Sequence, residues 1–198
     1  MNLLRPLRRL YDWTMGLAGH RHAIWWLAAI AFAEAIFFPI PQDILLIPMI
    51  LAARERAWRI AGIATVSSVA GGMLGYLVGY ELFELVGRPI LALYGHSDAI
   101  ETLREAYGQQ GWWIVLGGGL TPFPYKITTI ASGAMALDPW VFLAASIISR
   151  GLRFYAIAFL LWRFGPPIRN LIERRFGLMT TIFFVLLFGG FVAAAWIL

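Results

Sequence analysis

The sequence predicts an all-α integral membrane protein with two inverted re-entrant helical hairpins, each followed by a transmembrane helix. A C-terminal transmembrane helix and amphipathic interfacial helices complete the predicted fold. Three observations lead to it. The chain of 198 residues is 60% hydrophobic and only 14% charged, with a mean hydropathy of +0.72, whereas soluble domains are about one quarter charged. Several apolar runs are long enough to cross a bilayer. Two of these runs are interrupted by paired prolines.

The elements follow in chain order, and the whole chain, 1–198, is treated as one membrane domain. Residues 1–22 place leucines and arginines on different helical faces, which predicts an amphipathic helix at the membrane surface. No apolar run of signal-peptide length precedes Gly19, so we expect no cleavage. The other predicted segments are a hairpin over 23–53, a span over 58–80, a periplasmic amphipathic segment over 81–110, a second hairpin over 111–137, a span over 139–163 and a last span over 177–198.

The two interrupted runs share an order of features that indicates an internal repeat. Each has a tryptophan pair and then a P-x-P-x-charge motif, within FPIPQD (38–43) and TPFPYK (121–126), and each is followed by a long apolar span. Proline removes a backbone donor and prevents a continuous helix. We therefore predict hairpin tips at Pro39, Pro41, Pro122 and Pro124. The simpler alternative is two proline-kinked spans.

The basic residues favour the hairpins over the kinked spans. With hairpins, only Arg88 and Arg104 lie on the far side of the membrane. The cytoplasmic side, which also holds the N-terminus, then has 11 of the 16 basic residues: Arg5, Arg8, Arg9, Arg21, Arg54, Arg56, Arg59, Arg163, Arg169, Arg174 and Arg175. Cytoplasmic loops are enriched in Lys and Arg. The arms of the first hairpin are also shorter than the roughly 20 residues of a full span. A single span between the hairpins gives them opposite orientations, as in many secondary transporters.

Five ionisable residues interrupt the apolar segments and are the candidate functional residues. Glu34 and Asp43 lie in the first hairpin, Lys126 lies in the second, and Arg150 and Arg153 lie in the span that follows it. A charge at the bilayer centre costs about 2.5–3.5 kcal/mol on insertion scales, so these groups need partners or a wet cavity. Opposed hairpin tips are expected to bring the two acids toward Lys126, with Arg150 nearby.

Several interpretations of these five residues stay open. They could be structural salt bridges that hold the broken helices together. Asp43 could cap the helix that follows it. Glu34, among alanines and phenylalanines, is the better candidate for proton exchange, because an apolar environment disfavours a charged carboxylate. Arg153 could snorkel toward the membrane surface, or it could bind one phosphate together with Arg150.

Two further patterns concern packing and chemistry. Gly71, Gly72, Gly75 and Gly79 are spaced to form a close-packing helix face, and the glycines at 117–119 are expected to give flexibility. The chain has no cysteine and no hydrolytic or metal-ligand motif, so we expect no enzyme, no metal and no cofactor. The basic clusters flank apolar runs, which argues against a nucleic-acid partner.

The two motifs resemble the signatures of the DedA family of bacterial inner-membrane proteins. AFAEAIFFPIPQDILLIPMILA (31–52) is similar to the first signature, a Glu followed by a proline-containing tip and an acid. GLTPFPYKITTIASGAMAL (119–137) is similar to the second, where proline and a base precede a run of small residues. The order of segments is similar over about residues 20–165, and the chain looks like the short YqaA-like branch. DedA proteins are grouped with the VTT (SNARE-associated) domain proteins, which include eukaryotic lipid scramblases.

The resemblance implies two facing re-entrant hairpins in the bacterial inner membrane. It also implies proton-coupled transport of a polyprenyl phosphate, such as undecaprenyl phosphate, or of another polar lipid. By position, Glu34 and Asp43 match the essential acids of the family, and Lys126 matches the second of its two essential arginines. The first arginine has no counterpart, because Leu120 or Thr121 stands there.

We therefore expect a multi-pass transporter or flippase for a phosphate-bearing lipid. Glu34 and Asp43 are the expected proton-coupling residues, with the proton gradient as the driving force. Lys126, Arg150 and Arg153 are the expected headgroup ligands, and the two arginines are our own candidates for the missing family arginine. Membrane lipids are the expected partners, and homo-oligomers are an open alternative. Two other functions stay open: a proton-coupled transporter of small cations or metabolites, and a membrane assembly factor without transport activity.

Overall fold

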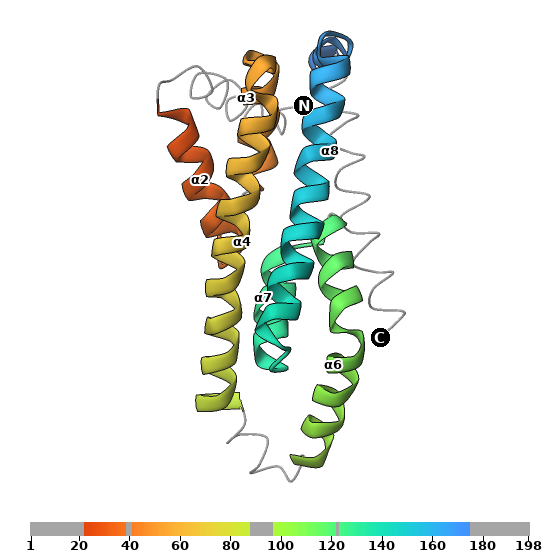
Figure 1. The fold of residues 1–198 in the computed structure, drawn as a ribbon. Helices are drawn as coiled ribbons and strands as arrows, with labels where there is room; N and C mark the ends of the chain where they lie inside the picture. The colour runs from red at the N-terminus through yellow and green to blue at the C-terminus, as the bar shows by residue number, and fades with distance from the viewer. Residues whose placement is uncertain (1–21, 39–40, 88–96, 122, 175–198) are drawn as a thin grey trace, which may run out of the picture.

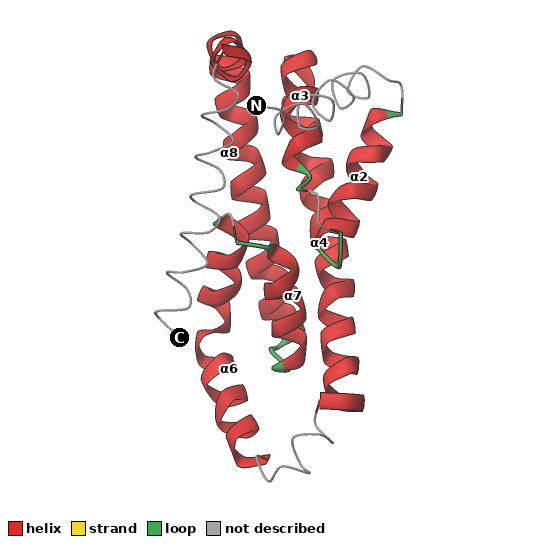
Figure 2. Ribbon diagram, turned by 180° about the vertical axis from the view of Figure 1, so that it is seen from behind, coloured by secondary structure: helices red, strands yellow, loops and turns green. Residues whose placement is uncertain are grey.

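The computed structural model of the chain describes residues 22–38, 41–87, 97–121 and 123–174. All regular structure within these ranges is helical (Figure 2). The elements are α2 (Ala23–Glu34), α3 (Asp43–Ala52), a short 3₁₀ turn η1 (Arg54–Arg56), α4 (Ala57–Leu82), a π-helical turn η2 (Phe83–Gly87), α6 (Ser97–Leu120), α7 (Tyr125–Ala134) and α8 (Pro139–Arg174). The predictions for residues 1–21 and 177–198, and for Pro39 and Pro122, lie outside the described residues.

Two long antiparallel helices, α4 and α8, form the centre of the structure (Figure 1). The stretches Arg54–Gly87 and Pro139–Gly165 are both long and apolar enough to cross a membrane, in agreement with the spans predicted there. A helix rises about 1.5 Å per residue, so each stretch exceeds the roughly 30 Å of a hydrocarbon core. The backbone of α8 leaves helical geometry at Phe164 and then continues to Arg174, beyond the predicted end of the span.

The other four helices pack on this pair in a repeated way. The first arm of each helix pair lies on the long helix that follows it in the chain: α2 packs on α4, and α6 packs on α8. The second arm of each pair packs on the long helix of the other half of the chain: α3 packs mainly on α8, and α7 packs on α4 (Figure 1). Both halves of the chain therefore follow one plan, as the internal repeat predicts.

The helix breaks occur at the predicted prolines. Pro41 lies just before α3, and Pro124 lies directly before α7 with φ −60° and ψ 108°. Proline suits the start of a helix because the first N–H groups there have no intrahelical acceptor. The preceding helices end earlier, α2 at Glu34 and α6 at Leu120, so each break spans several residues and not the proline alone.

The helix before the second break is longer than predicted. α6 runs from Ser97 through to Leu120, so the predicted boundary between 81–110 and 111–137 falls inside one helix. The residues before Gly108 are good helix formers without proline, and separated glycines lower helix stability without ending a helix. The polar and apolar parts of this region are therefore one continuous helix.

The predicted glycine face of α4 is confirmed. Gly71 lies against the backbone of α2 at Phe32, and Gly79 lies against the backbone of α7 at Ile130. Gly75 lies between the two, where an added Cβ would be 2.6 Å from Thr129 Oγ1 and 2.9 Å from the carbonyl oxygen of Ala35. Small residues let helix backbones approach closely, and here they let α4 contact both helix pairs.

The glycine run before the second break is packed at two of its three positions. A Cβ on Gly118 would collide with the side chain of Thr128, and one on Gly119 would collide with that of Ser149. A Cβ on Gly117 would meet no atom within 4 Å. Close packing therefore explains Gly118 and Gly119 better than the expected flexibility.

These contacts predict opposite effects for two glycine substitutions. Gly75→Ala should destabilise the protein by about 1–3 kcal/mol, because the new methyl group overlaps two neighbouring helices. Gly117→Ala should be neutral or stabilising by up to about 1 kcal/mol, because alanine favours a helix and the space is open. Thermal unfolding of both variants in the same detergent checks this. Equal midpoints for the two variants would contradict the packing.

Candidate functional site: a charged cluster between the helix breaks

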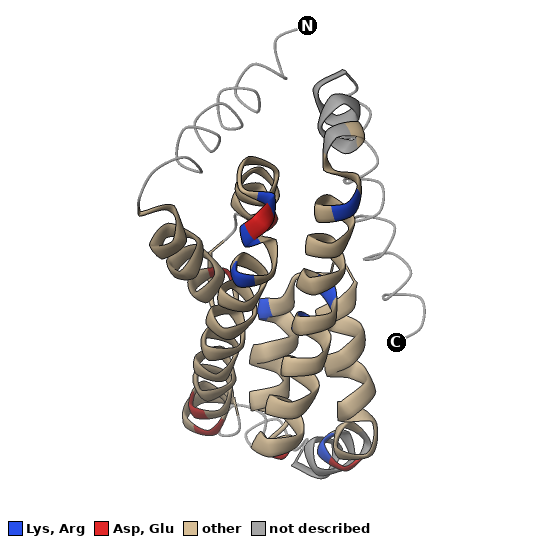
Figure 3. Ribbon diagram, turned by 45° about the horizontal axis from the view of Figure 1, so that its top comes forward, with Lys and Arg blue, Asp and Glu red and all other residues tan. Residues whose placement is uncertain are grey.

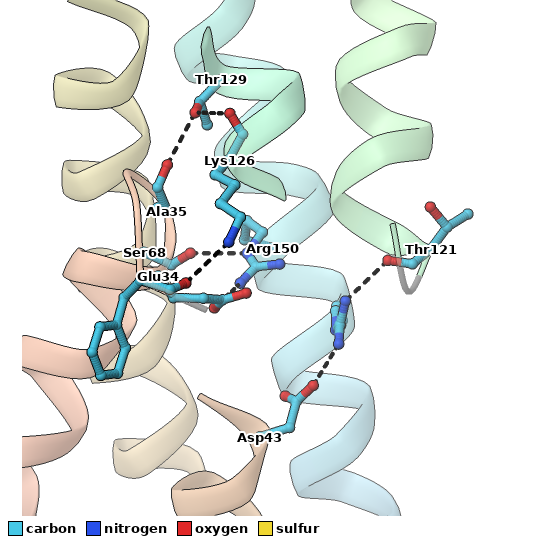
Figure 4. A network of polar contacts seen from close by, with 10 residues as sticks. Glu34, Ala35, Asp43, Ser68, Thr121, Lys126, Thr129 and Arg150 are labelled. Atoms are coloured by element: carbon cyan, nitrogen blue, oxygen red, sulfur yellow. Dashed lines mark hydrogen bonds and ion pairs between the residues drawn. The ribbon is translucent and has the colours of Figure 1, made fainter. Parts of the chain in front are cut away.

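The site begins with the free carbonyl groups at the two broken helix ends. The carbonyl of Ala35, just after α2, accepts a hydrogen bond from Thr129 Oγ1 at 3.0 Å, and that of Phe38 accepts one from Lys126 Nζ at 3.3 Å (Figure 4). The carbonyl of Thr121, just after α6, accepts one from Arg153 Nη1 at 3.0 Å. The last carbonyls of a helix have no intrahelical donor and form the negative end of its dipole. A cation from another helix therefore stabilises each broken end.

Arg150 lies at the centre of the cluster, midway along the membrane-length part of α8, and is only 1% exposed. Its Nε donates to Ser68 Oγ at 2.9 Å, and its Nη2 lies 3.4 Å from Glu34 Oε2 (Figure 4). The guanidinium carbon is 4.6 Å from the ring centres of both Tyr125 and Phe154. Aromatic faces attract cations, so Arg150 is held by contacts to α2, α4 and α7 as well as its own helix.

Arg153, one turn further along α8, forms a second ion pair. Its Nη2 lies 2.5 Å from Oδ2 of Asp43, the first residue of α3. The side chains of Arg153 and Asp43 are 20% and 18% exposed, whereas that of Arg150 is 2% exposed. The second pair is therefore the more accessible of the two.

The structure brings all five predicted charged residues together, but it pairs them differently from the prediction. The acids Glu34 and Asp43 bind the arginines of α8, whereas Lys126 donates to a carbonyl at the first break. The reason is that the chain just after α2 lies against the start of α7, and its free carbonyl groups need hydrogen-bond donors. Lys126 therefore lies at the first helix break, as expected, and its hydrogen-bond partner there is a carbonyl oxygen.

Two alternative interpretations of single residues are wrong. Asp43 does not cap α3, because Gln42 occupies the N-cap position and no side chain makes a capping hydrogen bond. Arg153 does not snorkel away, because Asp43 and Thr121 hold it at mid-length of α8. The two arginines bind different carboxylates, Arg150 that of Glu34 and Arg153 that of Asp43.

Neutral residues that the sequence motifs did not predict complete the cluster. Ser68 and Thr129 supply hydroxyl groups, and Tyr125 supplies an aromatic face. Gln42 is 1% exposed, and its side-chain amide has no hydrogen-bond partner within the described part of the chain. One signal was available: Gln42 and Tyr125 occupy the same position in the two P-x-P-x-charge motifs, directly before the charged residue.

The ends of the molecule differ in charge around this central cluster. Figure 3 shows basic residues in blue, with one acid in red, at the end where η1 lies. The segments η1, the start of α4 and α8 near its kink contain Arg54, Glu55, Arg56, Arg59 and Arg163. At that end Arg54 connects η1 to α8, because it donates a hydrogen bond to the carbonyl of Trp162. At the other end Arg104 Nη2 lies 2.6 Å from Glu84 Oε1. Among the described residues, no three His, Asp or Glu side chains form a group that could hold a metal ion.

The buried ion pair predicts a strong effect of single substitutions on stability. Arg150→Gln should destabilise the protein by about 3–5 kcal/mol, because it leaves Glu34 without its partner. Adding Glu34→Gln should recover part of this loss, since no uncompensated charge then remains. Arg163→Gln, at an exposed arginine outside the cluster, is the matched control and should change stability by less than about 1 kcal/mol. A double variant less stable than Arg150→Gln alone would contradict the pairing.

Comparison with known proteins identifies the family of the chain. The VTT domain family matches residues 40–163, from the first helix break through the span in α8. An uncharacterized protein of Haemophilus influenzae is 34% identical over 168 residues, covering 83% of this chain and 87% of that protein. An uncharacterized protein of Histophilus somni is 39% identical with the same coverage. No solved structure matches the chain. The chain thus belongs to the VTT domain (DedA) family of membrane proteins.

Proposed function

We propose that the protein is a proton-coupled secondary transporter that moves a phosphate-bearing polar lipid across the bacterial inner membrane. One observation carries the proposal: three cations and two acids meet between the helix breaks, at mid-length of two helices long enough to cross a membrane. Ionisable groups inside a membrane are costly, and they commonly mark the path of a substrate or an ion.

The lengths of three of the four helices in the two pairs support a re-entrant arrangement, and α6, with 24 residues, fits it through its apolar second half after Gly111. α2 has 12 residues, and α3 and α7 have 10 each. At about 1.5 Å per residue these helices reach roughly 15–18 Å, about half of a hydrocarbon core. Each pair then enters and leaves on one side with its break near the midplane, as in transporters built from inverted repeats. The basic end with Arg54 and Arg163 is then cytoplasmic, together with the N-terminus.

The electrostatics of the cluster suit an anionic headgroup. Asp43, in the first turn of α3, compensates the positive end of that helix dipole. Lys126 occupies the equivalent place in α7 and adds to the positive end of its dipole instead. The N-terminal end of a helix favours phosphate groups, and Lys and Arg are their usual side-chain partners.

Proton coupling follows from the two ion pairs. Glu34 pairs with Arg150, and the pair of Arg153 with Asp43 lies one turn further along α8, so protonation of Glu34 changes the net charge of the cluster. Protonation of Glu34 or Asp43 weakens its hold on an arginine and frees positive charge for the headgroup. Alternating exposure of the two hairpins then carries the headgroup from one leaflet to the other.

Movement of labelled polyprenyl phosphate between the leaflets of protein-containing liposomes tests this function. Wild-type protein should accelerate the movement well above empty liposomes, and a pH gradient should change the rate. Asp43→Ala and Lys126→Ala should each lower the rate at least tenfold, because each removes a charge of the cluster. Glu34→Gln should remove the pH dependence.

The matched control for this assay is Arg56→Ala, which removes a cation at the end of the molecule, away from the cluster. It should retain the wild-type rate. Folded wild-type protein that moves no lipid would contradict the proposal and favour a small solute as substrate. Full activity in Asp43→Ala and Lys126→Ala would show that the cluster is not the transport site.

Single-cysteine labelling tests the membrane arrangement. The chain contains no cysteine, so Glu55→Cys in η1 and Glu105→Cys in α6, both at exposed positions, report without background. A membrane-impermeant maleimide should label position 55 only from the cytoplasmic side and position 105 only from the opposite side. Labelling of both positions from one side would rule out the arrangement.

A further inference from the structure

The two arginines of α8 lie one turn apart, yet their surroundings assign them different tasks. Arg150 has a 2% exposed side chain and contacts on every side: Ser68, Glu34 and two aromatic rings. A headgroup reaches this guanidinium only if α2, α4 and α7 separate from it. Arg150 is therefore better suited to hold these helices together than to bind a ligand.

Arg153 is ten times more exposed than Arg150, and fewer contacts hold it. Its partners are one oxygen of Asp43 and the carbonyl of Thr121. Both partners adjoin a helix break, since Asp43 begins α3 and Thr121 follows the end of α6. A rearrangement at either break therefore changes the surroundings of Arg153 first.

Asp43 has the properties of a replaceable counter-ion. Only its Oδ2 accepts the guanidinium, and its buried Oδ1 has no hydrogen-bond partner among the described residues. A phosphate group carries more charge than a carboxylate and offers three terminal oxygens. Arginine binds phosphate with two parallel hydrogen bonds, so phosphate competes well for this guanidinium.

We propose that Arg153 binds the phosphate group of the substrate, that Asp43 is the counter-ion which the phosphate displaces, and that Arg150 is a positioning residue. The inference rests on the proposed function for the lipid origin of the phosphate. The chemistry itself is shared by a lipid phosphate monoester and by inorganic phosphate.

This assignment predicts opposite effects for the two members of one ion pair. Asp43→Asn removes the competitor of the phosphate, so the dissociation constant should fall about five- to tenfold. Arg153→Gln removes the ligand, so the constant should rise at least tenfold, in line with the strength of hydrogen bonds to charged groups. Arg153→Lys should give an intermediate value, because lysine keeps the charge and loses the bidentate geometry. A purely structural ion pair would make both substitutions weaken binding.

The experiment is a calorimetric titration of the purified full-length protein in detergent micelles at neutral pH. The three ligands are a short-chain prenyl phosphate, the corresponding prenol and inorganic phosphate. Wild-type protein should bind the prenyl phosphate, with little affinity for the prenol and weaker affinity for inorganic phosphate. Weaker binding of prenyl phosphate by both Asp43→Asn and Arg153→Gln would overturn the inference, while wild-type binding would still support a phosphate lipid as substrate.

The other outcomes separate the inference from the proposed function. If inorganic phosphate binds as tightly as the prenyl phosphate and shows the opposite effects of Asp43→Asn and Arg153→Gln, the assignment of Arg153 stands and the lipid substrate fails. If wild-type protein binds neither phosphate compound, both fail.

The positioning task of Arg150 has its own readout, the recovery of binding in double variants. Adding Glu34→Gln to Arg150→Gln should recover part of the lost affinity for prenyl phosphate, because it removes the stranded charge. Adding Asp43→Asn to Arg153→Gln should recover none, because the ligand for phosphate is missing. If Arg150→Gln does not fold, Arg150→Lys takes its place in the same pair of measurements. Recovery in the Arg153 pair and none in the Arg150 pair would reverse the assignment.

Discussion

The buried guanidinium of Arg150 is the constraint on which the rest of the structure depends. A charge removed from water without a partner costs several kcal/mol, so this side chain is tolerated only while its partners stay in place. These partners come from three other helices: Glu34 ends α2, Ser68 lies in α4, and Tyr125 begins α7. Arg153 adds contacts to α3 and to the end of α6. Two arginines on one helix therefore contact every other α-helix in the described part of the chain.

A second constraint, the broken helices themselves, explains why neutral and charged donors gather at the same place. A helix that ends inside an apolar medium leaves carbonyl groups that no lipid can satisfy. Thr129 and Lys126 satisfy those after α2, and Arg153 satisfies that of Thr121 after α6. These donors reach across because the glycines of α4 let the backbones of both helix pairs approach closely. The fold and the candidate site therefore have the same physical origin.

The sequence predicts the parts of this arrangement that follow from composition and spacing. The spans in α4 and α8, the breaks at paired prolines, the glycine face and the five charged residues all carry strong local signals. The pairing of the charges was not predictable, because it depends on how α8 is rotated about its axis, and Arg150 and Arg153 lie on neighbouring faces where a small rotation exchanges their partners. The continuity of α6 from Ser97 to Leu120 was not predicted, because its polar first half and its apolar second half carry different signals. Gln42 and Tyr125 do carry a sequence signal, since they occupy the same position of the two motifs.

The contacts also divide the first hairpin between two groups of helices. α3 is attached to α8 at both ends, through Asp43 to Arg153 and through Arg54, just after α3, to the carbonyl of Trp162. α2 instead packs on α4 and accepts hydrogen bonds from α7. Separation of α2 from α3 must therefore break the pair between Glu34 and Arg150, which joins α2 to α8. Protonation of Glu34 is the chemical step that most lowers the cost of breaking this pair, because it removes one of the two charges. A proton on that carboxyl group thus links the proposed coupling ion directly to the contact that holds the two groups of helices together.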